Sequence, residues 1–355
     1  MCLANHLNQI EENRIIEGWI HTFSRDPHQV NKPHEADAEL IPLPGTDQLI
    51  ALSIDTISEE IGLGFYQDPH TIGWMGATVT LSDLAAVGAR AAGLLISVTL
   101  PENSNVEFQL GIAAGVNDAC SRAGTHVIGG DTNFGATASI TTSGIGFVNR
   151  HRLLSRIGCQ PGDKLYATGR LGSGGLVAAK ALWENECDTY LKAFRPLARL
   201  TESQIIRQFA SACMDSSDGL IATLDQLCRL NQVGFELDRP VDEILDPDAL
   251  QFCSALDLDP LLMLAQPHGE FELVFTIPAG EQATFKRHAK KQNIDFLLLG
   301  EVISKPMIHL SYPESRTIES GRIRNLLHKV DGNFQRYLEE LIRILEGPHS
   351  DMTAD

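Results

Sequence analysis

Asp83 stands inside an apolar run of small residues, VTLSDLAAVGA (79–89). A carboxylate among leucine, alanine and valine side chains is costly to bury unless it is paired with a cation or coordinates a metal ion. Any fold that packs this run into a core must therefore bring a compensating group to Asp83. The rest of the chain has to supply that group.

Composition limits the kinds of partner that this chain can have. Its 355 residues are enough for two domains of ordinary size, and 43% hydrophobic with 21% charged residues is typical of a globular protein. The formal net charge of −18 argues against DNA, RNA or an anionic membrane as the main partner. A nucleotide remains compatible with this charge, because metal ions can bridge carboxylates to phosphates.

The sequence carries no sign of export or membrane insertion. Its start, MCLANHLNQIEENRIIEGWI, lacks a basic segment followed by an apolar stretch, and no run approaches the ~20 apolar residues of a membrane helix. The seven cysteines are scattered and none forms C-x-x-C, so neither a zinc knuckle nor a redox pair is indicated. We expect a cytoplasmic protein with reduced, buried thiols.

Helix-like and strand-like runs alternate through the first 150 residues. Ser104 or Asn105 is expected to cap one of the helices and Gly124 to end it. The apolar periodicity predicts helices at 8–24, 71–88 and 104–124, and strands at 48–55, 92–101, 126–132 and 138–148.

A second unit begins near the turn signal QPGD (160–163). Its predicted strands are 164–169, 212–217, 233–238, 271–278 and 295–303, with a helix opening at the glycine-rich 169–176 and an amphipathic helix over 323–345. We therefore predict a mixed α/β (α+β) fold with two domains, 1–152 and 153–355.

Five aspartates share one context, in which an apolar strand or small-residue run is followed by Asp and then by a turn residue. Each one alone is best explained as a helix cap or an Asx-turn. Five in one pattern favour a shared metal site, and oxygen ligands suit Mg²⁺, which binds carboxylates together with substrate phosphates. The five are Asp55, Asp83, Asp131, Asp215 and Asp218.

Several common phosphate-handling motifs are absent from the sequence. It contains no G-x-x-x-x-G-K-[ST] loop, no protein-kinase motif set and no G-x-S-x-G elbow. GRLGSGG (169–175) follows a predicted strand, but its spacing does not match the dinucleotide-binding G-x-G-x-x-G. The acidic pattern is thus the main functional signal.

The motifs LSDLAAVGA, GGDT, PGDKLYATGRLG and MDSSDGL, in this order, resemble those of thiamine-monophosphate kinases. FRPLARL (194–200) resembles a segment of the same family, which belongs to the superfamily of aminoimidazole ribonucleotide synthetase and selenophosphate synthetase. The resemblance implies two α/β domains, with the N-terminal domains of two subunits packing their sheets into a dimer barrel. It also implies an ATP- and Mg²⁺-dependent phosphotransferase of thiamine biosynthesis, with ATP and Mg²⁺ in a cleft lined by the aspartates.

The resemblance also assigns roles to individual residues. Asp218 and Asp215 would be the catalytic pair. The metal ligands would be Asp37, Asp55, Asp83, Asp131 and Asp218. The nucleotide would contact Asp55, Thr56, Gly129, Gly130, Asp131 and Thr132. The acceptor would contact Gly269, Glu270 and Phe271.

Two positions depart from the family pattern. In HEADAELI (34–41), Ala36 stands where the family has the first aspartate of Gly-Asp-Asp. In PHGEFELVF (267–275), Gly269-Glu270 stands where the family has Glu-Asp. His268 in the same segment is expected to be a solvated loop residue.

The departures leave the acceptor open. It is expected to be a small phosphorylated or nucleoside-like metabolite, in a protein without nucleic-acid or membrane partners. The alternatives are a non-catalytic or differently specific nucleotide-binding homologue and another ATP-dependent synthetase of the superfamily.

Overall fold

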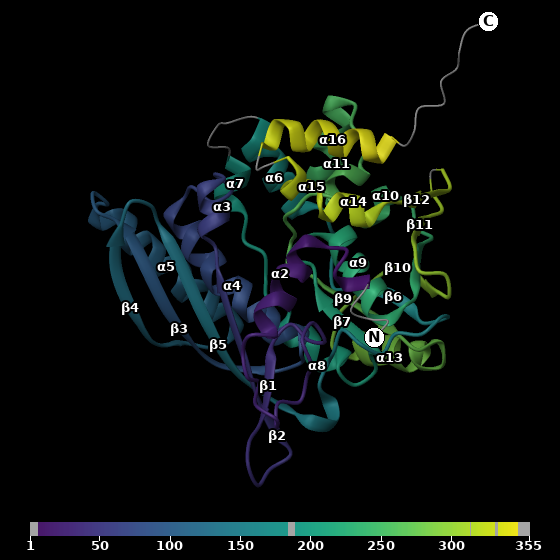
Figure 1. Cartoon of the computed structure of the whole chain (residues 1–355), viewed down its shortest axis with the longest axis horizontal. Coiled ribbons are helices and arrows are strands. Elements are labelled where there is room, and N and C mark those ends of the chain that lie inside the picture. Colours follow the sequence, from purple (N-terminus) through teal and green to yellow (C-terminus); the bar gives the residue numbers. More distant parts are fainter. Residues whose placement is uncertain (1–5, 184–188, 313, 331–332, 347–355) are drawn as a thin grey trace, which may run out of the picture.

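The protein folds as two β-sheets with helices packed on them, and a computed structural model describes residues 6–183, 189–312, 314–330 and 333–346 (Figure 1). The first sheet has five strands in the order β1-β2-β5-β3-β4, and the second has seven in the order β12-β11-β8-β10-β6-β9-β7. The mixed α/β class predicted from the sequence is confirmed.

The N-terminal half contains α2 to α5 and β1 to β5. Its strands pair antiparallel except for β3 and β4, which are parallel and joined through α5. The elements are α2 (Glu11–Ile20), β1 (Glu39–Pro42), β2 (Gln48–Thr56), α3 (Ser58–Gly62), α4 (Pro69–Ala86), β3 (Arg90–Pro101), α5 (Val106–Ala123), β4 (Val127–Gly135) and β5 (Ser139–Asn149).

The C-terminal half begins after a short 3-10 turn (Arg150–Arg152), and its strands pair antiparallel except for β11 and β8. Its strands are β6 (Lys164–Ala167), β7 (Ala212–Asp215), β8 (Gly234–Leu237), β9 (Leu273–Ile277), β10 (Leu297–Ile303), β11 (Ile308–Leu310) and β12 (Arg316–Ile318). Its helices are α6 (Ser173–Trp183), α7 (Thr189–Ala193), α8 (Leu200–Ile206), α9 (Leu220–Asn231), α10 (Val241–Ile244), α11 (Pro247–Leu256), α12 (Leu261–Leu264), α13 (Gln282–Lys291), α14 (Ser320–Arg324), α15 (Leu326–Lys329) and α16 (Phe334–Glu346).

Local sequence signals set the ends of the two long N-terminal helices. Asp68 caps α4 by accepting from the Thr71 amide, and proline follows it at the first helical position. Asn105 caps α5, and Gly124 ends it in a left-handed conformation with φ of 68°. The predicted cap and terminator of this helix are confirmed.

The predicted helix over 323–345 is wrong as a single element. The structure divides the region into α14, α15 and α16. Asn325 separates the first two pieces and accepts a hydrogen bond from the Glu11 amide, and Asn333 accepts one from the Arg336 amide where α16 begins. Asn333, whose side chain binds an amide of α16 itself, favours a new helix start there, whereas the Asn325 side chain binds α2 and makes no capping hydrogen bond to α15.

The helix expected over 8–24 is shorter than predicted and packs on the C-terminal half. Asn13 of α2 donates to Gln226 of α9, and Arg229 binds the His6 carbonyl. Part of its apolar stripe faces solvent, since Trp19 is 66% exposed.

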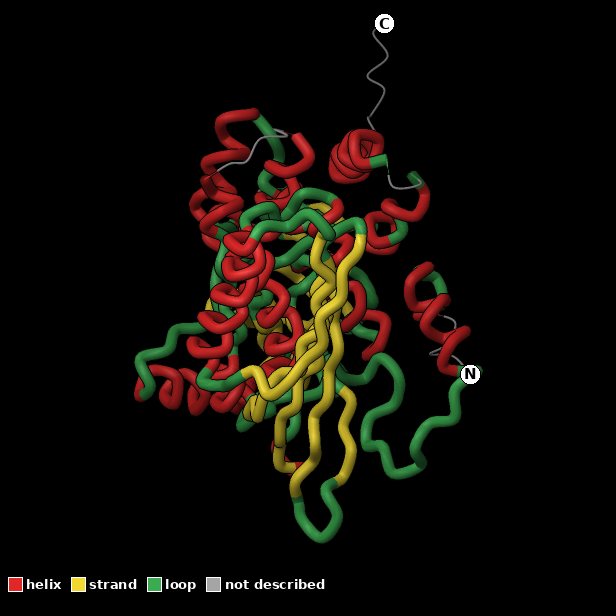
Figure 2. The backbone as a smooth tube through the Cα atoms, turned by 90° about the vertical axis from the view of Figure 1, so that its left-hand side faces the viewer, coloured by secondary structure: helices red, strands yellow, loops and turns green. Residues whose placement is uncertain are grey.

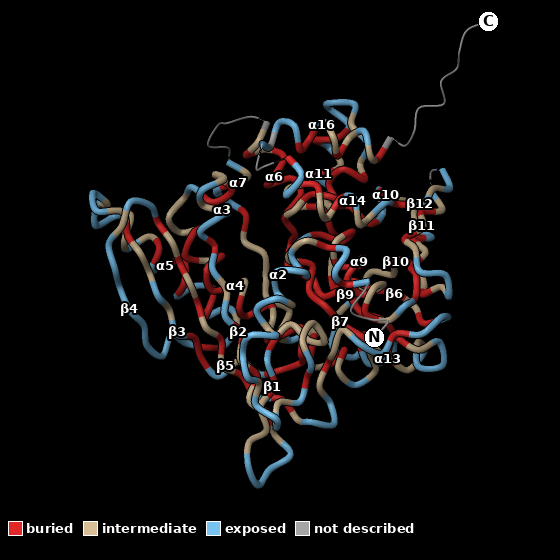
Figure 3. The backbone as a smooth tube through the Cα atoms, viewed as in Figure 1, coloured by how far each residue is buried: buried red, intermediate tan, exposed pale blue. Residues whose placement is uncertain are grey.

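The helices of the N-terminal half cover only one face of the first sheet. Figure 2 shows its strands as long, twisted ribbons, from which the β1–β2 hairpin projects. The opposite face carries apolar side chains in contact with solvent, including Ile54, 70% exposed, and Leu95, 43% exposed. Edge strand β4 is exposed along almost its whole length (Figure 3).

The last turn of α4 lies between the two sheets. Ala85 and Ala86 pack into a core cluster with Tyr166 and Phe275 of the second sheet. A further cluster joins Met75 to Phe271. The two halves therefore share cores along α4, and residues of its last turn are held against the end of β7.

No helix in the part of the chain that the structure describes combines the length and apolar character needed to cross a bilayer. The five described cysteines carry free thiols, and four of these are buried. Cys2 and Cys187 lie outside the described residues.

Gly115→Ala is expected to destabilise the protein by about 1–3 kcal/mol, the usual cost of overpacking. A Cβ at this position of α5 would lie 2.0 Å from the His70 carbonyl oxygen of α4, so the helices would have to separate. Gly18→Ala in α2 is the matched control, because no atom lies within 4 Å of its Cβ position. The control is expected to stabilise by about 0.5–1 kcal/mol. Urea unfolding measures both, and equal midpoints would contradict the close α4–α5 contact.

Candidate active site

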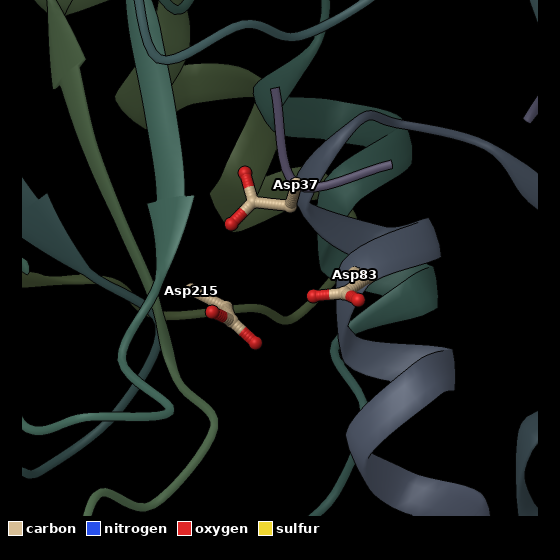
Figure 4. Close-up of side chains that lie close together, drawn as sticks. All are labelled: Asp37, Asp83 and Asp215. Atoms are coloured by element: carbon tan, nitrogen blue, oxygen red, sulfur yellow. The ribbon is translucent and has the colours of Figure 1, made fainter. Parts of the chain in front are cut away.

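Three aspartates from distant parts of the chain meet at the junction of the two sheets. Asp37 precedes β1, Asp83 lies in the last turn of α4, and Asp215 ends β7. Each offers a carboxylate oxygen, and the three oxygens lie within 4.8 Å of one another (Figure 4). An all-oxygen set of this size suits a hard divalent cation such as Mg²⁺.

Each of these carboxylates is positioned by a hydroxyl or a cation. Ser53 of β2 donates to Asp83, and Ser82 donates to Asp215 at 2.6 Å. Arg156 binds Asp37 at 2.9 Å. The second oxygen of Asp37 is buried and has no hydrogen-bond partner in the structure. The cluster thus retains an unsatisfied buried acceptor, which a bound cation would satisfy.

Burial and mutual repulsion disfavour the charged forms of Asp83 and Asp215. Burial, together with the nearby Asp55 and Asp215, raises the pKa of Asp83 well above its usual range. Burial and the charge of Asp37 raise the pKa of Asp215 to about 7. Burial likewise raises the pKa of Asp55, which lies beside Asp83. Several carboxylates sharing a site cannot all ionise without a counter-charge.

A cavity of about 690 Å³ opens beside the cluster. Among the described residues that line it, seven are acidic and one, Arg156, is a permanent cation. Asp218 contacts solvent through this cavity, while the surrounding protein desolvates its carboxyl enough to raise its pKa to about 6. The cavity is thus a site for a cation or for a ligand that carries cations with it.

The structure brings most of the predicted metal ligands together. Asp37, Asp55, Asp83 and Asp218 all line the cavity, and Asp215 lies behind it in contact with Ser82. The predicted nucleotide contact Thr56 and the predicted acceptor contact Phe271 line it as well. These positions come from β2, α4, β7 with the loop after it, and the segments that precede β1 and β9.

The GGDT segment, Gly129 to Thr132, lies apart from this cavity on edge strand β4. Asp55 of β2 lies opposite Thr142 of β5, which lies opposite Ile96 of β3, and Ile96 lies opposite Gly130 of β4. Three strand steps of ~4.8 Å give a separation of about 14 Å. Because successive side chains alternate between the faces of a strand, Asp131 points to the open face of the sheet, where Asn133 donates to it.

The predicted acceptor residues Gly269 and Glu270 are buried beneath the cavity and do not line it. Glu270 accepts from the Ser216 hydroxyl at 2.7 Å and from the Gly172 amide at 2.6 Å. Burial raises its pKa to about 7. A Cβ at position 269 would lie 1.5 Å from the Ser216 carbonyl oxygen, so only glycine fits there. This part of the segment braces the loop that carries Asp218.

Sequence reasoning missed four charged residues that line the cavity, namely Glu12, Glu39, Glu60 and Arg156, and it misjudged His268, which lines the cavity as well. His268 is buried against Phe65 and hydrogen bonded to Tyr66, so the solvated histidine expected there is wrong. Burial lowers its pKa to about 4, which leaves it neutral at pH 7. Arg156 lies four residues before the start of the QPGD turn (160–163). A site lined by so many aspartates needs a cation to offset their charge, and this need was the available signal for Arg156. Glu12 and Glu60 lie on helices without any comparable motif.

Family models for AIR synthase related proteins match this chain in two parts, the N-terminal domain at residues 35–148 and the C-terminal domain at 160–312. Thiamine-monophosphate kinase of Synechococcus elongatus is 30% identical over 302 residues, which are 80% of this chain and 88% of the relative. Thiamine-monophosphate kinase of Archaeoglobus fulgidus is 32% identical over 66% of this chain and 76% of its own length.

Two solved structures share the fold. One is tt0281 from Thermus thermophilus, with a TM-score of 0.73 and 29% identity over 85% of this chain and 97% of that one. The other is described as AaThiL complexed with AMPPCP and TMP, with a TM-score of 0.69 and 22% identity over 87% of this chain and 97% of that one.

Asp83→Asn is expected to raise the melting temperature of the ligand-free protein at pH 8 in the presence of a chelator. Because their folded-state pKa values are raised, Asp83 and Asp215 contribute most to stability at low pH, and that contribution is lost as the pH rises through about 4 to 7. Asparagine at position 83 removes one of the repelling charges and keeps the size and shape of the aspartate side chain. The gain should shrink at pH 5, because Asp215, whose pKa is raised to about 7, is protonated there.

Asp37→Asn is the matched control for this measurement. It leaves the guanidinium of Arg156 without its carboxylate partner and should lower the melting temperature at both pH values. Differential scanning calorimetry measures both variants. A lower melting temperature for Asp83→Asn than for wild type at pH 8 would refute repulsion within the cluster.

Proposed function

This chain belongs to the AIR synthase related proteins, among the relatives of thiamine-monophosphate kinase, and from that premise we propose that it is an ATP- and Mg²⁺-dependent kinase of a small metabolite. The observation that carries the proposal is the group of buried aspartates at the junction of the two sheets. Phosphoryl transfer needs mainly positioning and neutralisation of charge, and such a site serves both. The AMPPCP and TMP of the neighbouring structure support a nucleotide beside a small acceptor.

The residues present fit Mg²⁺. The donors are all oxygen, burial raises the pKa values of Asp55, Asp83 and Asp218, and Asp37 retains an unpartnered oxygen. Asp37, Asp55, Asp83 and Asp218 would hold the ions, with Asp215 fixed behind them by Ser82. When bound, Mg²⁺ supplies charge neutralisation for the transferred phosphoryl group. The carboxylates must lose their protons for this, so metal affinity should increase as the pH rises.

The chain's own groups supply orientation at this site. Arg156 points into the acidic cavity while held by Asp37, so its charge is available to a phosphate and fixed in position. Asp218 lies at the boundary between the acidic cavity and a second cavity of about 300 Å³. We assign the acceptor to this second cavity, with its reacting end at Asp218.

The loss of an aspartate at Ala36 bears on activity. Ala36 packs against the N-terminal core and offers no ligand atom. Losing one charge-assisted contact costs about 1.5–3 kcal/mol. ATP–Mg²⁺ binding should therefore persist, whereas turnover of thiamine monophosphate should be weak. A homologue that binds nucleotide without turning it over is the alternative, and an ATP-consumption screen against phosphorylated and nucleoside-like acceptors separates the two.

We also propose a homodimer formed through the open face of the first sheet. That face exposes Ile54 and Leu95 together with edge strand β4, and exposed apolar faces of this kind mark interaction sites. Asp131 lies on the same face. Pairing of two such faces would give Gly129 to Thr132 a place at the nucleotide site of the assembled protein, which the single chain does not offer. With domain limits of 1–152 and 153–355, the proposed dimer interface would lie within the first domain.

Asp83→Asn and Asp131→Asn are each expected to lower ATP turnover by at least roughly a hundredfold, because each removes charge that offsets the developing phosphoryl charge. Asp242→Asn, an exposed position on α10, is the control and should retain wild-type rates. Coupled ATP-consumption assays with Mg²⁺ measure this. Full activity of Asp83→Asn would contradict the proposed active site. Full activity of Asp131→Asn alone would show that β4 does not contribute to that site.

Ile54→Asp is expected to convert the dimer into monomers at micromolar concentration, because it places a charge in the proposed apolar interface. Tyr312→Asp alters an equally large, half-exposed side chain on the C-terminal half and should leave the dimer intact. Multi-angle light scattering gives the mass of each. A monomeric wild type with full activity would contradict the dimer.

A further inference from the structure

His268 is enclosed by aromatic side chains that come from both halves of the protein. It is 4% exposed, and the ring of Phe65 stacks on its ring with the centroids 5.3 Å apart and the planes 2° from parallel. Three further rings stand nearly perpendicular to it at centroid distances of 5.6, 5.8 and 6.1 Å, those of Tyr66, Phe194 and Phe271. A polar imidazole enclosed in this way needs hydrogen-bond partners for its nitrogens.

The His268 ring has two such partners. Its Nε2 atom lies 2.8 Å from the Tyr66 hydroxyl, and the ring also hydrogen bonds to the backbone of Ser217. The bond to Ser217 favours a protonated nitrogen, so the ring donates there, and Nε2 of the neutral ring accepts from the Tyr66 hydroxyl. Packing thus fixes one tautomer and one orientation of the ring.

Ser217 connects this pair to the acidic site. Its hydroxyl donates to Asp215 at 3.0 Å, and its carbonyl oxygen accepts from the Gly269 amide at 2.7 Å. The next residue is Asp218, which lines both cavities. A displacement of the His268 ring would therefore move the backbone from which the Asp218 side chain projects.

Tyr66 belongs to the other half of the protein. It lies in the loop between α3 and α4, a short distance along the chain from Asp55, which lines the acidic cavity. Tyr66 is 1% exposed, so its hydroxyl is removed from water and depends on a protein partner. The hydrogen bond from Tyr66 to His268 thus links the half that presents Asp55 to the loop that presents Asp218.

We propose that His268 is a positioning residue for phosphoryl transfer, which through its hydrogen bond to Tyr66 holds the Asp218 loop in place against the N-terminal half. This inference rests on the proposed function, because it concerns the geometry of that reaction. Phosphoryl transfer depends on the placement of the groups around the phosphate. A small displacement of Asp218 should therefore slow the chemical step more than it weakens nucleotide binding.

Tyr66→Phe removes the hydroxyl and keeps the aromatic ring. Tyr166→Phe is the matched control: Tyr166 is also 1% exposed and its hydroxyl accepts from the Gln282 amide at 2.7 Å, but it is not among the described residues that line either cavity. Tyr66→Phe should lower kcat by about five- to tenfold, the weight of one neutral hydrogen bond, and leave KM for ATP within about twofold. Tyr166→Phe should keep wild-type values of both, although it too loses a buried hydrogen bond.

Two substitutions of His268 test whether it acts together with Tyr66. His268→Phe keeps a ring among the aromatic side chains, loses both hydrogen bonds and should lower kcat by about tenfold or more. His268→Gln offers an amide oxygen to the Tyr66 hydroxyl and should recover part of that loss. The double variant Tyr66→Phe/His268→Phe should have the kcat of His268→Phe alone, because the Tyr66 hydroxyl then has no ring nitrogen to hold.

Backbone hydrogen exchange of residues 215–219 measures the position of the loop without any turnover. The Gly219 amide donates to the Ser216 carbonyl oxygen at 3.1 Å, so a loosened loop exposes an amide that is protected in the wild type. Tyr66→Phe should speed exchange in this segment, and Tyr166→Phe should leave it unchanged.

Three results would each overturn the inference: unchanged exchange in Tyr66→Phe, an equal fall in kcat for Tyr166→Phe, or losses that multiply in the double variant. A wild type that turns over no ATP with any acceptor would instead count against the proposed kinase. The exchange comparison would still decide whether Tyr66 and His268 hold the Asp218 loop.

Discussion

The hydrogen bond from Ser82 to Asp215 joins the last turn of α4 to the end of β7, where the two halves of the protein pack together. Both partners are buried, and the Ser217 hydroxyl donates to the other oxygen of Asp215 at 3.0 Å. Asp83 is the next residue on α4 and is thereby placed against Asp215. The position of the acidic site thus follows from the packing of one helix between two sheets, with Ala85 and Ala86 small enough to allow it.

This arrangement destabilises the free protein through electrostatic repulsion. Carboxylates from three separate elements share a desolvated space, and among the described residues that line it Arg156 is the one permanent cation. Groups with strongly perturbed pKa values in a cavity are characteristic of functional sites. A divalent cation would be attracted by the carboxylates that repel one another. The free protein is therefore destabilised at this site, and binding of the cation would remove that destabilisation.

The segment from Gln266 to Glu272 has two roles that the family resemblance does not separate. Gln266 and Phe271 line cavities, and Phe271 holds a left-handed backbone with φ of 60° that is uncommon for a side chain of this size. Glu270 and Glu272 point inward, to Ser216 and Arg199, and hold the Asp218 loop in place. Neighbouring residues of one short segment therefore divide into ligand-facing and structural groups.

The sequence alone predicted most helices and strands of the N-terminal half, because caps, glycines and alternating apolar residues act locally, but it missed β1 and α3 and made α2 too long. It also determined that Asp55, Asp83, Asp215 and Asp218 belong to one acidic site, since each ends or follows a buried element. It could not place Asp131, whose face depends on strand register, or find Glu12 and Glu60, which carry no motif. Tertiary structure decided those positions, the burial of His268 and its hydrogen bond to Tyr66. Each results from packing between elements far apart in the chain, which no local pattern encodes.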